Sequence, residues 1–257
     1  MPDMPILGFF VLCLVVLWLG ILIGSWIQGS RKALVESEMT VINVLEGALL
    51  TLFGLLIGFT FSMAVSRYDA RKLLAVQEAN AIGTTWLRTA TLPEPVRSQE
   101  QSLLREYTQE RLLYHTEFRL REESHYNEQQ ADILRKRLWA VASNYAVDHR
   151  ESMTTLYLQA LNSAIDTAGE RVAADENRIP AEAWWMLLFV GFVACVVLGT
   201  KIGQRRWVLQ SILPVVLAAT LTMTMDLDSP RFGFIRVTQV DMEKVAADMT
   251  RLPQQMP

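Results

Sequence analysis

The sequence has only two cysteines and no excess of positive charge. Its 24 lysine and arginine residues stand against 27 aspartate and glutamate residues. There is therefore no basic surplus to neutralise a phosphate backbone, and we expect no nucleic-acid partner. Cys13 and Cys195 both fall inside apolar segments, where cysteine behaves as a small buried hydrophobe, and we assign no disulfide.

Motifs for catalysis and metal binding are also lacking. His115, His125 and His149 lie in charged stretches without a partner motif, and no catalytic triad is found. No phosphate-binding loop, HExxH or paired CxxC occurs either. Asp226 and Asp228 supply only part of a calcium ligand set, so we interpret them as a cap and hydrogen-bond anchor. We predict no catalytic residue, no metal site and no cofactor. The protein is not expected to be an enzyme.

Long apolar runs are what the sequence has instead. Hydrophobic residues make up 51% of the chain, which is more than a soluble globule of this size needs. Runs with almost no charge are long enough to cross a lipid bilayer. The predicted spans are residues 4–29, 46–66, 183–200 and 207–225. The first lacks a basic region before it and is interpreted as a retained anchor. We predict an all-α, multi-pass membrane protein with a lipid bilayer as its surroundings.

The order of these spans predicts four parts. Residues 1–66 should form a first transmembrane hairpin, and residues 183–226 a second one, because only six residues separate its spans. Between them, residues 67–182 are charged and rich in helix-forming residues, which predicts a soluble helical domain. Residues 227–257 are expected to be a C-terminal tail.

Within the central domain, breakers divide the expected helices. The second span should continue as one helix to about residue 90, since Leu92-Pro93 is the first breaker. A second helix is expected from Pro95 to about residue 121, and two more over residues 127–146 and 150–174.

The orientation is left open by the charges. Short loops rich in lysine and arginine favour the cytoplasm, and both short connectors are positive, at Arg31-Lys32 and at residues 201–206. That places the central domain outside. Positive residues also flank the other ends of the spans, so the rule does not decide.

The second span carries a stripe of small and polar residues. Steps of three and four residues put its members on one helix face. The members are Gly47, Thr51, Gly54, Gly58, Ser62 and Ser66. Gly54-x-x-x-Gly58 fits a close helix-packing motif, and packing is the first interpretation. The second is that several copies surround an axis, so that the hydroxyl groups line a polar path with Phe59 and Phe61 on its flanks.

Charged residues follow this stripe along the same expected helix. Arg67, Arg71, Glu78 and Asn80 are the candidates for a charged pore mouth. The alternative is an ordinary solvated helix face. Charge reversal at Arg67 and Arg71 should alter ion selectivity only in the first case.

Several runs together resemble the bestrophin-like bacterial membrane proteins. They cover most of the chain from residue 45 to residue 245. The matching residues include 58–71, 78–88, Leu92-Pro93, Leu104 to Tyr107, Leu161-Asn162, Asp166, Arg171, Asn177 to Pro180, Trp185 and Asp228 to Gly233.

The resemblance implies an analogy to bestrophins, which are pentameric anion channels with two transmembrane hairpins around a helical cytosolic region. The resemblance places the central domain in the cytosol, whereas the positive charge of the short connectors favours a location outside. The stretch from Pro230 to Gly233 is similar to a proline-phenylalanine-glycine motif, but Arg231 interrupts it. The acidic calcium clasp of animal bestrophins is not recognisable, so calcium gating is not carried over.

Two functions follow for this chain. The leading one is an oligomeric channel of the bacterial inner membrane that conducts anions along the second span. The rival is a sensor or scaffold whose helical domain binds a partner or a ligand and which conducts nothing. An intramembrane enzyme and a proton-coupled transporter are disfavoured, because the spans hold almost no ionisable residue.

Overall fold

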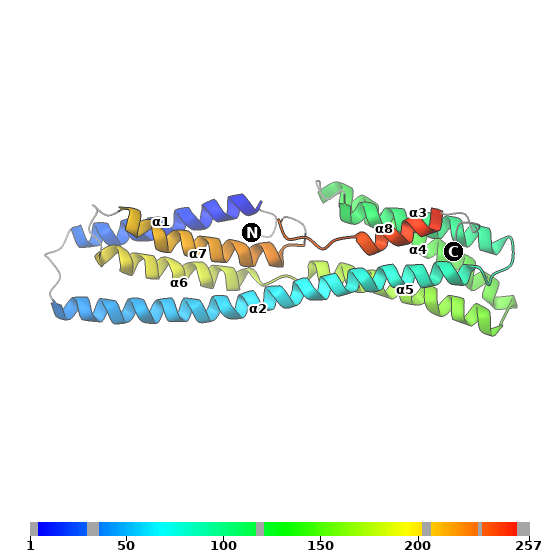
Figure 1. Cartoon of the computed structure of the whole chain (residues 1–257), viewed down its shortest axis with the longest axis horizontal. Coiled ribbons are helices and arrows are strands. Elements are labelled where there is room, and N and C mark those ends of the chain that lie inside the picture. The colour runs from blue at the N-terminus through cyan, green and yellow to red at the C-terminus, as the bar shows by residue number, and fades with distance from the viewer. Residues whose placement is uncertain (1–4, 30–35, 117–120, 202–206, 231–232, 251–257) are drawn as a thin grey trace. The chain divides into compact units, whose positions relative to one another are not determined.

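Eight α-helices make up the regular structure of the described chain (Figure 1). The computed structural model describes residues 5–29, 36–116, 121–201, 207–230 and 233–250. The helices are α1 Ile6–Gly29, α2 Glu36–Thr89, α3 Val96–Thr116, α4 Arg121–Asp148, α5 Ser152–Glu176, α6 Ala181–Lys201, α7 Trp207–Asp228 and α8 Val240–Thr250. The prediction of an all-α protein is confirmed.

The chain divides into two compact units. Unit 1 comprises Met1–Tyr68 and Asn177–Arg236, and unit 2 comprises Asp69–Glu176 and Val237–Pro257. Helix α2 supplies a part to each unit, as expected for a helix without a breaker before residue 90. It ends at Thr89, whose hydroxyl donates to the carbonyl oxygen of Trp86 at 2.7 Å.

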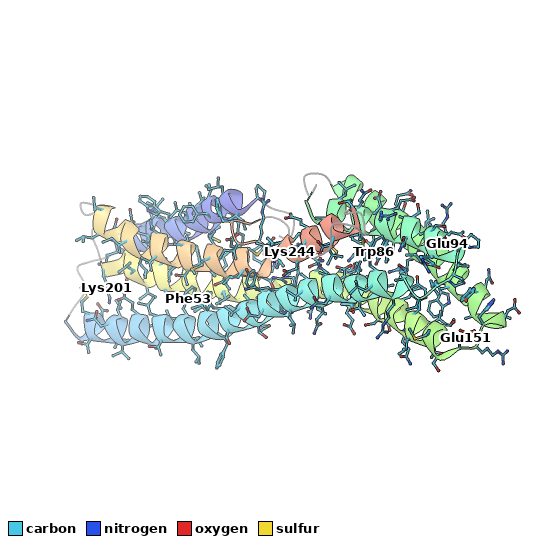
Figure 2. The ribbon with its side chains drawn as sticks, turned by 45° about the vertical axis from the view of Figure 1, so that its right-hand side comes forward. Phe53, Trp86, Glu94, Glu151, Lys201 and Lys244 are labelled. Carbon is cyan, nitrogen blue, oxygen red and sulfur yellow. The ribbon has the colours of Figure 1, made fainter. Side chains whose placement is uncertain are left out.

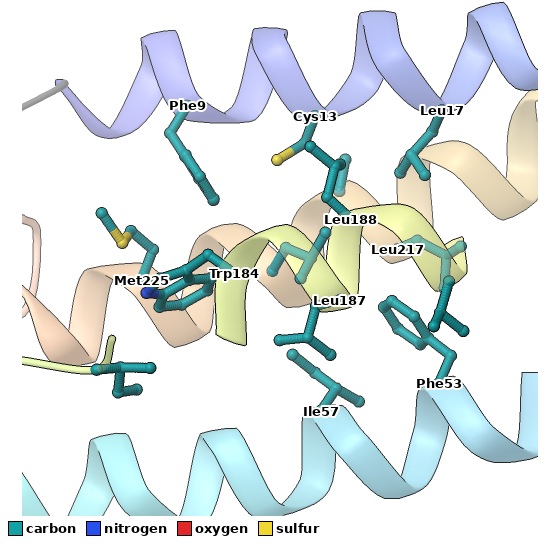
Figure 3. Packing of buried hydrophobic residues seen from close by; sticks show 14 of the residues in the cluster. Phe9, Cys13, Leu17, Phe53, Ile57, Trp184, Leu187, Leu188, Leu217 and Met225 are labelled. Carbon is teal, nitrogen blue, oxygen red and sulfur yellow. The ribbon is translucent and has the colours of Figure 1, made fainter. Parts of the chain in front are cut away.

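Unit 1 is built from apolar helices around one core. Figure 3 shows side chains of α1, α2, α6 and α7 meeting there. Phe9 of α1 and Trp184 of α6 pack edge to face with ring centroids 5.8 Å apart, and Leu187 of α6 meets Ile57 of α2. Their burial fixes which face of each helix turns inward.

Each of these helices also exposes large apolar side chains on its outer surface. Leu7 and Trp26 of α1 are 68% and 71% exposed. Four described stretches are long and apolar enough to cross a membrane: Ile6–Gly29, Ser37–Thr89, Ser152–Lys201, which includes α5 and α6, and Val208–Asp228. A helix that is hydrophobic inside and outside fits a lipid environment.

Glycines let α1 and α6 approach closely. A Cβ atom on Gly24 would collide with the backbone carbonyl oxygen of Val196, and one on Gly199 with that of Ile21. A Cβ atom on Gly20 would lie 2.9 Å from the carbonyl oxygen of Phe192. Small residues at such contacts are the usual means of close packing between membrane helices.

Unit 2 has its own hydrophobic core, formed by the last part of α2 with α3, α4, α5 and α8. Leu104, Leu138 and Leu161 are among its fully buried side chains. Helix α4 begins at Arg121, six residues before the predicted start. Helix α8 lies where only a tail was expected.

Arg105 holds the end of α8 in unit 2. Its Nε donates to the carbonyl oxygen of Met249 at 3.0 Å. Its guanidinium carbon also lies 4.7 Å from the ring centroid of Trp86, which is labelled in Figure 2. The C-terminal helix is therefore an integral part of this core.

Candidate functional site

The small and polar stripe of α2 is exposed along its whole length in unit 1. We call this surface the α2 stripe, made of Gly47, Thr51, Gly54, Gly58, Ser62 and Ser66. An added Cβ atom at Gly47, Gly54 or Gly58 would meet no described atom within 4 Å. The Gly54-x-x-x-Gly58 motif therefore packs against no described helix of the same chain. Among the described helices, the glycines in close contact with a neighbouring helix backbone lie on α1 and α6 instead.

The residues on the opposite face of α2 explain why the α2 stripe points away from the core of unit 1. Phe53, Ile57 and Ala64 are buried in the core of unit 1. A Cβ atom added to Gly191 of α6 would lie 3.3 Å from the Phe53 ring. The hydroxyl of Thr60 donates to the carbonyl oxygen of Leu56 at 2.8 Å. With these residues facing inward, the stripe must face away from the core of unit 1.

The exposed face is not uniformly polar. Leu55 is 55% exposed and lies seven residues before Ser62, and so on the same face. Phe59 is 65% exposed beside it. The hydroxyl of Thr51 donates to the carbonyl oxygen of Gly47 at 2.8 Å. In a membrane, such a mixed face is stable where another helix or water covers it.

Arg67 lies at the end of the α2 stripe and pairs with α7. Its Nη1 is 3.7 Å from Oδ1 of Asp228. Oδ2 of Asp228 also accepts the backbone N–H of Ile179 at 3.1 Å. Asp226 accepts the N–H groups of Phe234 at 2.8 Å and of Ile235 at 3.2 Å. Asp228 thus anchors backbone just before α6, and Asp226 anchors backbone just after α7. Both serve as the hydrogen-bond anchors that the sequence suggested.

Two of the four mouth candidates are buried. Arg71 is 2% exposed and Glu78 is 0% exposed, whereas Asn80 is exposed. The interpretation as a solvated helix face is therefore wrong for Arg71 and Glu78. Their positions follow the buried repeat of α2 in unit 2, which continues through Ala75 and Ile82.

Glu78 lies between two arginines in the core of unit 2. Nε of Arg111 is 2.5 Å from Oε1, and Nη1 of Arg171 is 2.5 Å from Oε2. Nη2 of Arg171 donates to Oε1 of Gln239 at 2.7 Å. Burial alone would raise the pKa of Glu78, but the two guanidinium groups outweigh it and hold that pKa below its ordinary value. This cluster joins α2, α3 and α5 to the segment before α8.

A second buried carboxylate was missed in the sequence. Glu100 of α3 is 0% exposed and accepts the hydroxyl of Tyr157 at 2.7 Å on Oε2. Its Oε1 is buried and has no hydrogen-bond partner among the described residues. Burial raises the pKa of Glu100 to about 7, although the hydrogen bond from Tyr157 lowers it. Its spacing of four and seven residues from Leu104 and Tyr107 could have revealed it.

Known proteins match both the sequence and the fold of this chain. The family model of the bestrophin-like domain matches residues 7–242. The chain belongs to the bestrophin-like family. The expectation drawn from the motifs is confirmed.

Solved structures of similar fold include a bacterial bestrophin homologue from Klebsiella pneumoniae. It is 14% identical, with a TM-score of 0.65, over 98% of this chain and 100% of that one. A variant of that homologue gives 14% identity and a TM-score of 0.64, over 96% and 99%. A crystal structure described as a membrane protein gives 12% and 0.65, over 98% and 100%. No curated protein matches this sequence.

The family and the apolar helices together identify this bestrophin-like chain as a membrane protein. At 14% identity, the likeness to solved structures establishes the fold alone.

Proposed function

We propose that this bestrophin-like chain is an oligomeric membrane channel in which the α2 stripe lines a path for anions. The observation that carries the proposal is the exposure of the stripe. At three glycines in it, an added Cβ atom would meet no described atom within 4 Å, while Phe53 and Ile57 hold the opposite face of α2 in the core. Copies of α2 around a common axis would cover this surface with one another and with water.

The proposed topology has two transmembrane hairpins. Helix α1 with the first part of α2 forms the first hairpin, and α6 with α7 forms the second, in the inner membrane of a bacterium. Arg31, Lys32, Arg205 and Arg206, on which the orientation depends, lie outside the described residues. Cysteine labelling at residues 31–38 and 120–128 tests the orientation. Labelling from outside at the first segment alone would place unit 2 in the cytosol, and the reverse would place it outside.

Only some of the candidates for a charged mouth near the α2 stripe are accessible to a permeating anion. Arg67 shares its charge with Asp228, and its side chain is 19% exposed. Arg71 and Glu78 are buried, so of the mouth candidates Arg67 and Asn80 are the two that can meet a permeating ion. Reversal of the charge at Arg67 should lower the permeability of chloride relative to potassium.

The test of the channel is ion flux in liposomes made with the purified full chain. Chloride flux and a chloride-dependent reversal potential are expected. A protein that stays folded and oligomeric but passes no ion would overturn the proposal.

The second candidate is a sensor or scaffold. It is favoured by a polar groove between α2 and α5 in unit 2. A monomeric protein, or a silent oligomer that binds a ligand there, would support this function instead.

A further inference from the structure

A groove in unit 2 is lined by seven residues with polar side chains and by two alanines. Its volume is about 450 Å³, which is in the range of small-molecule sites. We call it the α2/α5 groove. Its lining residues are Gln77, Asn80, Ala81, Thr84 and Arg88 of α2, and Gln159, Ala160, Ser163 and Thr167 of α5.

The polar groups of this groove are largely unengaged. Within the described ranges, five of its side chains make no hydrogen bond to the protein: Gln77, Asn80, Thr84, Gln159 and Ser163. Thr85, next in the chain, donates to the carbonyl oxygen of Ala81 as helical threonines commonly do. Amide and hydroxyl groups therefore remain available to a ligand, as donors and as acceptors.

The charge of the lining is positive. Arg88 is its one ionised residue, and none of the nine lining residues is acidic. Nη1 of Arg88 donates to the carbonyl oxygen of Leu156 at 2.5 Å, which holds the guanidinium across from α2 to α5. Asp166 adjoins Thr167 in the chain but accepts a hydrogen bond from Asn162 at 2.7 Å and does not line the groove.

This composition selects a class of ligand. A guanidinium group recognises a carboxylate, and the surrounding amides and hydroxyls suit a ligand with several hydroxyl groups. An amino acid would bring an ammonium group for which the lining has no carboxylate. We propose that the α2/α5 groove binds a small hydroxylated organic anion, with its carboxylate on Arg88 and its hydroxyls on the neutral side chains. This site goes beyond conduction, since binding at equilibrium does not require a pore.

Calorimetric titration of the full chain in detergent tests the site. Sodium gluconate is the probe, with glucose as the neutral comparison and sodium chloride to match ionic strength. We expect saturable binding of gluconate at one site per chain, and none of glucose. Absence of saturable gluconate binding, or equal binding of glucose, would overturn the proposal.

Two variants test the residues. Arg88→Gln removes the charge, and Asn80→Asp adds a negative charge at a side chain with no bond to the described protein. Each should weaken gluconate binding by about tenfold or more, as expected for loss of a charged hydrogen bond or for like-charge contact. Asn80→Asp decides the matter if Arg88→Gln fails to fold.

Matched controls lie elsewhere in unit 2. Arg97 also donates to a backbone carbonyl, that of Leu92 at 2.8 Å, and Asn144 is an exposed residue of α4. The dissociation constants of Arg97→Gln and Asn144→Asp for gluconate should lie within about twofold of that of the parent chain. That is well below the tenfold change that corresponds to about 1.4 kcal/mol. Equal affinities of Asn80→Asp and Asn144→Asp would overturn the site. If the chain conducts no ion but shows the expected pattern of gluconate binding, the channel proposal is wrong and the proposal of a binding site stands.

Discussion

Arg171 and Glu78 form an ion pair in which both side chains are withdrawn from water. Nη1 of the arginine lies 2.5 Å from Oε2 of the glutamate, and the side chains are 3% and 0% exposed. Arg111 occupies the other carboxylate oxygen. Because two guanidinium groups share one carboxylate, removing the carboxylate leaves two buried cations without their counter-ion.

Glu78→Gln should therefore destabilise the full chain strongly. The loss of one member of a buried ion pair costs about 3–5 kcal/mol. Thermal and denaturant unfolding in detergent, followed by circular dichroism, would measure the change. Asp132→Asn is the control, because Asp132 pairs with Arg135 and Lys136 at a partly exposed site. That change should cost at most about 1 kcal/mol. Similar losses for the two variants would contradict the assigned role.

The pH dependence of this pair has a definite sign. Since the folded pKa of Glu78 is below its ordinary value of 4.5, its contribution is present above pH 4.5 and is lost as pH falls below it.

Glu100 should act in the opposite direction. Its folded pKa is raised from 4.5 to about 7, so the folded protein binds more protons than the unfolded chain between these values. Stability from this group is therefore greatest below about pH 4.5 and declines as pH rises toward 7, by a few kcal/mol at most. Glu100→Gln keeps an acceptor for the hydroxyl of Tyr157 and removes the titration. Between pH 5 and pH 8 the parent chain should lose stability that Glu100→Gln keeps. The unfolding free energy of the variant minus that of the parent chain should therefore increase over this range.

Tyr157→Phe gives the matching control for Glu100. It removes the hydrogen bond at 2.7 Å and keeps the carboxyl group. The decline of stability between pH 5 and pH 8 should persist in this variant. A decline that is equally steep in Glu100→Gln would show that another group is responsible.

The positions of the apolar helices were predictable from the sequence because charge marks their ends. Helix α6 covers Ala181–Lys201, against a predicted span of residues 183–200, and α2 ends at Thr89, just before Leu92-Pro93. Charged side chains and proline leave the same signal whatever the tertiary contacts are.

The roles of the charged residues were less predictable. Glu78 stands in a charged stretch of the kind that usually forms a solvated helix face. Its burial depends on Arg111 and Arg171, which are 33 and 93 residues away in the chain. The available signal was helical spacing, since Glu78 lies three residues after Ala75 and four before Ile82, on the buried face of α2. For the glycines, spacing does not say which motif has a partner helix. Gly54 and Gly58 have none among the described residues, whereas Gly20 and Gly24 do.

Alanine at Gly24 should separate these two kinds of glycine. A Cβ atom there would meet the carbonyl oxygen of Val196, a backbone atom that cannot rotate away. We expect Gly24→Ala to cost about 1–3 kcal/mol through overpacking. Gly54→Ala should leave the folding of the single chain unchanged or stabilise it slightly, since alanine is the better helix former. Thermal unfolding in detergent would compare them. A loss in Gly54→Ala equal to that in Gly24→Ala would contradict the packing assigned to unit 1.

Cysteine at Ser62 should make the proposed channel sensitive to a water-soluble thiol reagent. Reaction requires the thiolate, which forms in water and not in lipid. Ser62 belongs to the α2 stripe, so a bulky adduct on Ser62→Cys should reduce chloride flux severalfold. Cys13 and Cys195 are buried and should leave the parent chain unaffected. Val15 is 49% exposed on α1, a helix that carries none of the α2 stripe. The reagent should leave flux through Val15→Cys unchanged. If it blocks both variants alike, or neither while flux persists, the stripe does not line the path.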